Sequence, residues 1–153
     1  MRALIERIID QALSESERKL VPIYTFALYF NHESLALSVC IDTEENSKAT
    51  VARINTYNRK YFSPAVASGD LKGASLWLAN AGRSLSLGDF HIVNVAREEL
   101  PEGFSPSQEF FVSLVQTLAI AERKIAEQAE SPQSLLLCSS GMSSEVEYWW
   151  SVA

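Results

Sequence analysis

The first twenty residues place their apolar side chains three and four positions apart, which is the period of a helix. Charged residues such as Glu6, Arg7 and Asp10 occupy the other side. The pattern predicts an amphipathic helix over residues 3–19, which Pro22 prevents from continuing. Its apolar stripe consists of Leu4, Ile5, Ile8, Ile9, Ala12 and Leu13.

Two short apolar runs, residues 23–30 and 35–41, follow on either side of the polar tetrapeptide 31–34. The first run is apolar on both faces of a pleated strand, whereas large and small residues alternate in the second. Together they predict a β-hairpin whose first strand is central in a sheet and buried on both faces.

A second helix is predicted over residues 43–61, where apolar residues again recur at helical spacing. Two registers are available for its start. Asp42 with Glu45, or Thr43 with Asn46, would satisfy the free backbone amides of the first turn.

A shorter helix is predicted after the loop 63–69. Asp70 would cap its start, and Gly82 would end it in the left-handed conformation. The β-branched run 90–96 then predicts a third strand.

The longest predicted element is a helix over residues 106–130. Ser105, Pro106 and Gln108 would supply its N-cap, its first-turn proline and its capping-box partner. A short buried strand is predicted after it, at residues 135–139.

Residues 145–153 fit two structures, and the sequence leaves both open. Val146, Tyr148 and Trp150 alternate as in a strand, but the same stretch also fits a helix capped by Ser144. On a strand, Trp149 and Trp150 cannot both point inward, so one of them would face a partner or a second subunit.

These elements predict an α+β fold in which residues 1–153 form a single domain. We expect a mainly antiparallel sheet of four or five strands, with the helix over residues 106–130 packed on one face.

The net charge and the lengths of the apolar runs limit the classes of partner and the location that we expect. A net charge of −6 argues against nucleic acid and anionic membranes as partners and is compatible with a basic protein partner. No apolar run approaches the roughly 18–20 residues that span a bilayer, and no signal-peptide core is present, so we expect a cytoplasmic protein.

The two cysteines, Cys40 and Cys138, lie inside apolar strand-like runs, where a thiol usually behaves as a small hydrophobic side chain. A disulfide would form only if their strands were neighbours. Without an export signal we expect free thiols.

A cluster of serines around Gly141 raises the possibility of a nucleophile. A nucleophile elbow requires Gly-x-Ser-x-Gly and a histidine later in the chain, whereas His32 and His91 both precede these serines. We therefore expect turn and cap roles for them. The serines are Ser139, Ser140, Ser143 and Ser144.

Metal and cofactor motifs are missing from the sequence as well. It has no His-x-x-x-His, Cys-x-x-Cys, EF-hand or phosphate-loop spacing. His32 and Asp42 would lie about 20 Å apart at the two ends of one strand. We predict no catalytic, metal-binding or cofactor-binding residue.

Several stretches, in order, resemble a family of small bacterial α/β proteins related in style to the immunity proteins of contact-dependent and polymorphic toxin systems. They are the N-terminal amphipathic helix, IYTFALYF, DTEE at 42–45, LGDFHIVNV, the long helix and the final SLLLCSSGMSSEVEYWW. The resemblance implies an antiparallel sheet with helices against it and no established catalytic residues. Several such families clamp onto a toxin and block its active site by surface complementarity.

The preferred hypothesis is therefore a protein-binding module, not an enzyme, that acts as an immunity- or antitoxin-like inhibitor of a basic toxin. The predicted contacts are acidic side chains at a helix start and in a loop, together with the C-terminal tryptophans. These residues are Asp42, Glu44, Glu45, Glu98, Glu99, Glu102, Trp149 and Trp150.

Two alternatives remain open. One is a small-molecule-binding or enzymatic domain with a pocket near His91, lined by Asp89 and an aromatic residue such as Tyr61. The other is a homodimer formed through Trp149 and Trp150.

Overall fold

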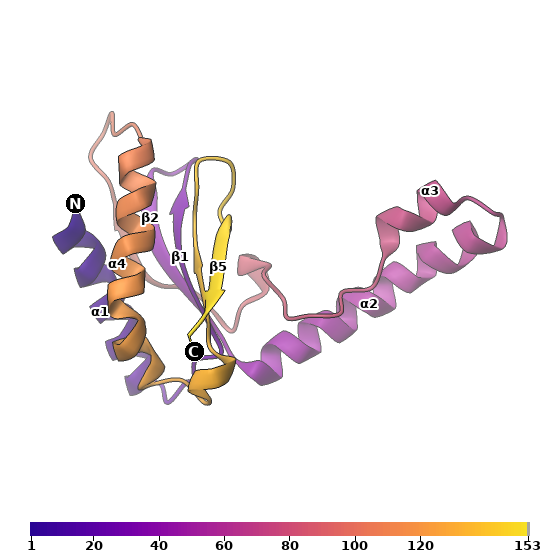
Figure 1. The fold of residues 1–153 in the computed structure, drawn as a ribbon, viewed down its shortest axis with the longest axis horizontal. Helices are drawn as coiled ribbons and strands as arrows, with labels where there is room; N and C mark the ends of the chain where they lie inside the picture. The colour runs from indigo at the N-terminus through magenta and orange to yellow at the C-terminus, as the bar shows by residue number, and fades with distance from the viewer. Residues whose placement is uncertain (153) are drawn as a thin grey trace.

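The structure, a computed structural model, describes residues 1–152 and consists of a two-layer body with a long projecting arm (Figure 1). The helices are α1 (Arg2–Arg18), α2 (Glu44–Ala67), α3 (Leu71–Ala74) and α4 (Gln108–Ala126), with short 3-10 turns at Ser75–Trp77, Leu87–Asp89 and Pro132–Ser134. The strands are β1 (Thr25–Asn31), β2 (Ala36–Asp42), β3 (Ile92–Glu99), β4 (Leu136–Ser139) and β5 (Tyr148–Ser151).

The five strands form one sheet in the order β3-β2-β1-β4-β5. Three of the four pairings are antiparallel, and β1 pairs with β4 in parallel. The predicted α+β fold is confirmed. The predicted hairpin is confirmed too, with β1 in the centre and Asn31 Oδ1 accepting hydrogen bonds from the Glu33 and Ser34 amides at 3.0 Å in its turn.

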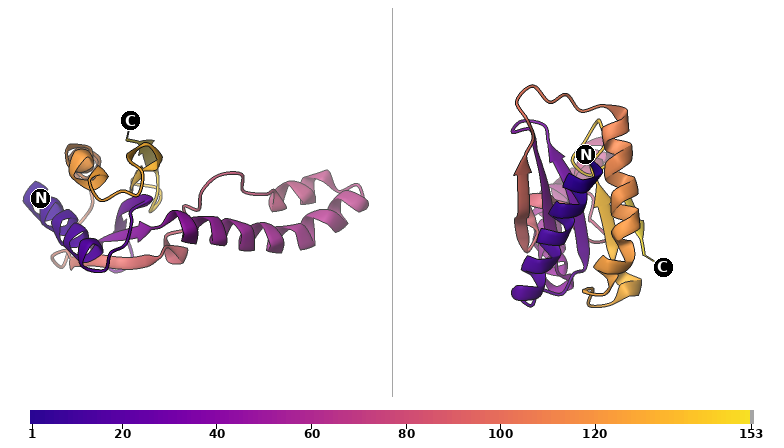
Figure 2. Two further views of the ribbon diagram at one scale, coloured as in Figure 1. Left: turned by 90° about the horizontal axis from the view of Figure 1, so that it is seen from below. Right: turned by 90° about the vertical axis from the view of Figure 1, so that its left-hand side faces the viewer.

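Helices α1 and α4 cover one face of the sheet, and the main core lies between them and the strands (Figure 2). Phe30 of β1 is central to it and makes edge-to-face contacts with Phe104, Phe110 and Phe111. Each fully buried side chain of this size contributes about 1.5–3 kcal/mol to folding. The alternate residues of β1 that point to the helices are Phe26, Leu28 and Phe30.

The opposite face of the sheet has no long helix packed on it and is lined by small residues together with Tyr29. Ala27, Cys40 and Cys138 form a row across β2, β1 and β4. The segment around Leu87 and Phe90 covers this row. Because β1 separates the two cysteines, their Cα atoms lie about two strand spacings apart, roughly 10 Å, which is too far for a disulfide. Both thiols are free and buried, as expected.

Helix α4 is present, but the predicted cap is wrong. Its N-cap is Ser107, whose side chain accepts a hydrogen bond from the Phe110 amide at 3.2 Å, and not Ser105. Packing decides the register, because a start at Gln108 places Phe110 and Phe111 in the first turn, against Phe30.

The helix predicted to run from Asp70 to Gly82 is much shorter in the structure. It has the expected cap, with Asp70 Oδ1 accepting from the Gly73 amide at 2.8 Å, but it ends at Ala74. Gly82 is not in the left-handed region and ends no helix, because the chain beyond Trp77 is extended and follows α2 back to the body.

The third strand and the tail complete the sheet. β3 begins at Ile92, two residues later than predicted, so His91 precedes the strand. The C-terminal stretch forms strand β5, which decides between the two structures that the sequence left open; Ala153 lies outside the described residues. Trp150 packs against the main core, whereas Trp149 is 55% exposed.

The N-cap of α2 gives a test of how the body fixes this helix. Thr43 Oγ1 accepts a hydrogen bond from the Asn46 amide at 3.1 Å, so Thr43→Ala should lower the free energy of unfolding by about 1 kcal/mol. The matched control is Thr56→Ala in the same helix, whose hydroxyl bonds only to the Ala52 carbonyl. Urea unfolding should show a loss for Thr43→Ala alone; equal effects of the two substitutions would contradict the assigned cap.

Candidate functional site

The candidate site is an arm formed by residues 48–83, which leaves the body on the side of the sheet opposite α1 and α4 (Figure 1, Figure 2). Helix α2 forms its outward leg. Only Ser47 and Thr50 are buried among the 24 residues of α2. Both lie in its first two turns, where the arm joins the body, which we call the root of the arm. Most of this helix therefore has no contact with the core.

Asparagine side chains hold the returning leg of the arm against α2. Asn55 Nδ2 donates to the Asn80 carbonyl at 3.0 Å, and Asn55 Oδ1 accepts from the Asn80 amide at 2.8 Å. One helical turn further out, Asn58 Nδ2 donates to the Leu78 carbonyl at 3.0 Å. These bonds satisfy backbone groups of an extended segment that has no strand partner.

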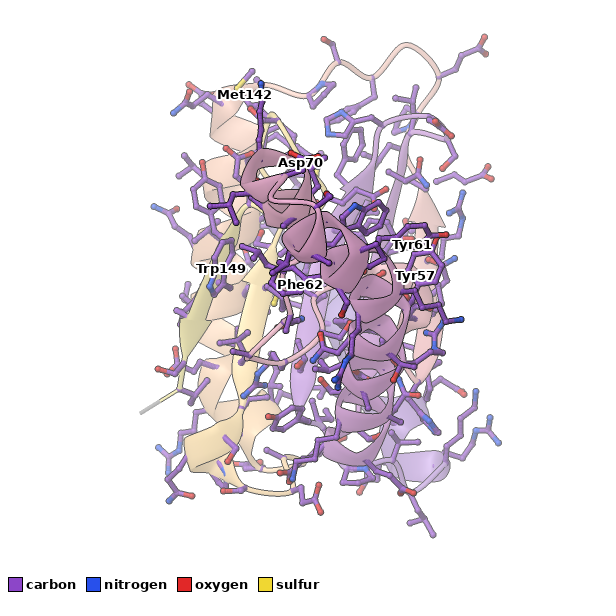
Figure 3. The ribbon with its side chains drawn as sticks, turned by 90° about the vertical axis from the view of Figure 1, so that its right-hand side faces the viewer. Tyr57, Tyr61, Phe62, Asp70, Met142 and Trp149 are labelled. Atoms are coloured by element: carbon purple, nitrogen blue, oxygen red, sulfur yellow. The ribbon has the colours of Figure 1, made fainter. Side chains whose placement is uncertain are left out.

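Three aromatic side chains, Tyr57, Tyr61 and Trp77, form a cluster on the distal arm, which we call the aromatic cluster. The Tyr61 and Trp77 rings are stacked with centroids 4.5 Å apart, and Tyr57 lies 5.2 Å from Tyr61 and 6.2 Å from Trp77. Tyr57 is 51% exposed and Tyr61 45% exposed, and Figure 3 shows both on the arm as seen from its tip. Further exposed apolar side chains on the arm are Val66, Leu71, Leu76 and Leu78.

The arm is basic and the body is acidic. Residues 48–83 contain six Lys and Arg against one Asp, a net charge of +5, and the rest of the chain contains seven Lys and Arg against eighteen Asp and Glu, a net charge of −11. Near the root, Lys48 pairs with Glu44 at 2.6 Å and Arg53 with Asp89 at 3.1 Å. Within residues 1–152, no ion pair engages the distal cations Arg59, Lys60 and Lys72.

Arg83 fixes the returning leg to the sheet. Its Nη1 donates to the Tyr24 carbonyl at 2.7 Å and to Thr25 Oγ1 at 3.1 Å, and its Nη2 donates to the Ser134 carbonyl at 2.6 Å. The guanidinium also lies 3.7 Å from the centroid of the Tyr24 ring. A delocalised cation held by three oxygens and an aromatic face is a firm anchor.

Asp42 fixes the outward leg and is completely buried. Its Oδ1 accepts hydrogen bonds from the Thr43 amide at 3.0 Å, the Asn46 side chain at 2.7 Å and the His91 amide at 3.1 Å. Its Oδ2 has no partner among the described residues. Burial raises the pKa of this carboxyl above its ordinary value, against the opposing effect of the Asn46 bond. A buried side chain of this kind offers a partner no surface.

The other predicted acidic contacts lie at two separate ends of the sheet. Glu44 and Glu45 begin α2, whereas Glu98 and Glu99 end β3, where Glu99 pairs with Ala36 at the far end of β2. About six strand residues, or roughly 20 Å, separate the two groups. Glu45, Glu99 and Glu102 are exposed, and Glu98 forms an ion pair with Arg7 of α1. The structure does not bring the two groups together.

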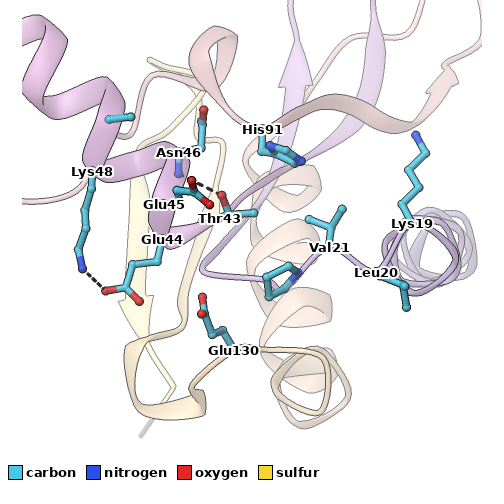
Figure 4. Close-up of a pocket in the computed structure, with 12 residues that line it drawn as sticks. Lys19, Leu20, Val21, Thr43, Glu44, Glu45, Asn46, Lys48, His91 and Glu130 are labelled. Carbon is cyan, nitrogen blue, oxygen red and sulfur yellow. Dashed lines mark hydrogen bonds and ion pairs between the residues drawn. The ribbon is translucent and has the colours of Figure 1, made fainter.

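The pocket expected near His91 exists as a surface hollow of about 780 Å³ between the start of α2 and the end of α1 (Figure 4). Thr43, Glu44 and Glu130 line it with His91. None of the hydrogen bonds and ion pairs that we find in residues 1–152 involves the His91 imidazole. The other two residues predicted for this pocket are elsewhere, since Asp89 pairs with Arg53 and Tyr61 lies on the arm.

The serines around Gly141 shape the connection between β4 and β5. Ser140 Oγ accepts from the Phe30 amide at 2.8 Å and donates to the Glu145 carbonyl at 2.7 Å. Ser144 Oγ donates to the Val146 carbonyl at 3.0 Å, and Ser139 Oγ to the Ser140 carbonyl at 3.3 Å. These are the turn roles that the sequence indicates.

The two C-terminal tryptophans face opposite sides of the sheet. Trp150 contacts the core on the side of α4, and its Nε1 lies 3.4 Å from Glu122 Oε2. Trp149 lies at the β5 edge of the sheet (Figure 3) and lines a shallow hollow with Glu147 and with Val115 of α4. Only Trp149 has a largely exposed ring.

Within residues 1–152, no three His, Cys, Asp or Glu side chains gather as a metal site. None of the helices in that range has the length and apolar character needed to cross a bilayer.

The arm was missed by the sequence analysis, because Tyr57 and Tyr61 recur at the spacing of a core-facing stripe. The signal that marks it is charge. Nearly half of the cationic side chains of the chain fall in residues 48–83, with Asp70 as the single acidic residue.

Comparisons of the chain with protein-family models, curated proteins and solved structures found no match. The resemblance to immunity-protein families therefore stays a prediction.

Asp42 provides a test of the root. Because its pKa is raised in the folded state, the folded protein binds more protons than the unfolded chain between the ordinary carboxyl pKa and the raised one, and stability falls as pH rises through that window. Asp42→Asn keeps the accepting Oδ1 and removes the charge, so its stability relative to wild type should increase as pH rises through the window.

Asp42→Ala is the matched control. It leaves the Thr43, Asn46 and His91 donors without their acceptor and should cost about 1–3 kcal/mol at every pH. Both effects can be measured by urea unfolding between acid and neutral pH. A pH-independent difference between Asp42→Asn and wild type would contradict the raised pKa.

Proposed function

We propose that the protein is a protein-binding module and that the arm is its principal contact surface. The observation that carries the proposal is the exposed aromatic cluster on a two-legged arm that the body anchors at both ends. Monomeric proteins rarely expose a large contiguous apolar surface, and such surfaces mark interaction sites. Tyrosine and tryptophan are also the residues that dominate the energetics of protein interfaces.

The anchoring of the arm supports a recognition role. An isolated helix is marginal in water, so a projecting helix needs either contacts of its own or a partner. Here Asp42, Arg83 and the asparagine bonds hold the arm at its root and along its length, while the distal face presents the aromatic cluster. A preformed surface binds a partner with less loss of conformational entropy.

The acidic body supports the more specific hypothesis of an inhibitor of a basic toxin. A net charge of −11 outside the arm would accelerate the approach of a cationic protein. Glu99 and Glu102 at one end of the sheet, or Glu44 and Glu45 at the other, would then contact the partner. This mode of action needs surface complementarity and no chemistry.

The test is coexpression of the tagged chain with the products of neighbouring genes, followed by purification and measurement of the mass and affinity of any complex. Tyr57→Ser/Tyr61→Ser should weaken binding by about 30-fold or more, because interface hot spots contribute about 2 kcal/mol or more. For the inhibitor hypothesis, the wild-type chain should also protect cells that express the cognate toxin.

The control variant is Ile120→Ser, since Ile120 is an exposed apolar residue of α4, on the body. Its binding should match wild type, and circular dichroism should show all variants folded. A complex that the arm substitutions leave intact would contradict the role of the arm. The inhibitor hypothesis fails if the chain neither binds nor protects against any of these gene products.

A further inference from the structure

The arm and the sheet enclose a right-angled space. α1 and α4 occupy one side of the sheet, and the arm extends from the other side, so that its length and the helix-free face form the two limbs of an L (Figure 1, Figure 2). Figure 3 shows Trp149 at the β5 edge, on one flank of the arm, and Tyr57 and Tyr61 on the other flank. Within one copy the exposed tryptophan and the aromatic cluster therefore lie apart.

The charges on the two limbs are complementary. Distal to the root, the arm carries Arg59, Lys60 and Lys72 against Asp70. The connection before β5, residues 140–147, carries Glu145 and Glu147 and no cation, and Glu147 shares its hollow with Trp149. One copy of the chain thus offers an apolar, basic surface and an apolar, acidic one.

The same charges disfavour pairing between two arms. Two distal arms brought together would place the three cations of one beside those of the other, with a single carboxylate on each side. Like charges in contact are unfavourable, so the arm is expected to meet the acidic body.

The exposed apolar area is enough for a weak dimer. A complete Tyr or Trp side chain buries about 150–250 Å², so the exposed halves of Tyr57, Tyr61 and Trp149 supply on the order of 300 Å² per copy. Leu71, Leu76 and Leu78, each 60% or more exposed, add to it. This area already covers both reciprocal contacts of a copy, so it stays below the about 800 Å² per partner of a standard interface and is typical of a weak, concentration-dependent dimer.

We infer that the occupant of the arm surface is a second copy of this chain, in a reciprocal dimer in which the aromatic cluster of each copy packs against Trp149 of the other. Arg59, Lys60 and Lys72 then face Glu145 and Glu147 across the contact. A two-fold axis makes both contacts at once and closes the assembly. The inference rests on the proposed function, since it names the partner of the proposed contact surface.

Sedimentation of the purified chain from about 1 to 100 μM tests the inference, because this range covers dissociation constants that reciprocal contacts of moderate area produce. The wild-type mass should rise from the 17.0 kDa of one chain to twice that value. Raising the salt concentration should weaken the dimer, because the facing charges are exposed. Tyr57→Ser/Tyr61→Ser and Trp149→Ser should each weaken it by about 30-fold or more.

Mixing the two variants gives the decisive measurement. The Trp149→Ser chain keeps a functional arm and the Tyr57→Ser/Tyr61→Ser chain keeps a functional Trp149, so the mixture retains one of the two contacts. It should dimerise more tightly than either variant alone and less tightly than wild type. The control Ile120→Ser should behave as wild type, and circular dichroism verifies that each variant is folded.

Three results would overturn the inference. A wild-type chain that stays monomeric over the whole range has no self-association to explain. A dimer that Trp149→Ser leaves unchanged pairs through its arms or elsewhere, and variants that show no mutual rescue do not share a reciprocal contact. If the chain is monomeric but binds a neighbouring gene product through the arm, the proposed function stands and the second copy is replaced by that partner; if the arm substitutions change neither measurement, both fail.

Discussion

The buried carboxylate of Asp42 sets the geometry of the whole molecule. One oxygen accepts hydrogen bonds from the start of α2, from the Asn46 side chain and from the residue before β3, so three segments are fixed around one atom at the end of β2. A buried charge is costly unless such bonds compensate it. The direction in which α2 leaves the sheet follows from this arrangement, since its first turn is tied to a carboxylate that cannot move.

Arg83 fixes the returning leg of the arm at the root, through a cationic donor where Asp42 is an acceptor. Its guanidinium satisfies carbonyl groups at Tyr24 and Ser134, next to the central strands β1 and β4. The buried Asp42 of the body and the part-buried Arg83 of the arm thus hold an element that contributes little to the core. Such an arrangement is understandable when the arm serves binding, because its distal residues need a fixed position and not burial.

Local patterns in the sequence were sufficient for the elements that pack against the core. Helices α1 and α4 each have one buried face, which their apolar stripe shows, and the apolar runs of β1 and β2 mark strands that are buried on both faces. The caps were predicted less well. Thr43, one of the two predicted N-caps, caps α2. Helix α4 is capped by Ser107 and not by Ser105, because that start places Phe110 and Phe111 against Phe30. Tertiary packing, which a local motif does not contain, selected between Ser105 and Ser107.

The candidate site was harder to predict, because a helical stripe has the same period whether it faces a core or a single returning segment. Tyr57 and Tyr61 fit the first interpretation and belong to the second. Likewise, the predicted acidic contacts were inferred from charge alone. The folded structure shows that Asp42 is buried, and the strand register shows that Glu45 and Glu99 lie at opposite ends of the sheet. The uneven distribution of lysine and arginine was the one sequence feature that pointed to the arm.

Cys40 and Cys138 flank Ala27 in a row across the middle of the sheet, so their thiols can report on the opening of the sheet. Burial raises the pKa of Cys40 to about 11 and that of Cys138 to about 12, so both side chains are protonated and shielded in the folded state. A thiol-specific reagent therefore reacts only when the sheet opens, and the two cysteines record separately whether β2 or β4 has left the central strand. In the wild-type chain, without any added label, the reaction rates of the two thiols thus report the order in which β2 and β4 separate from β1.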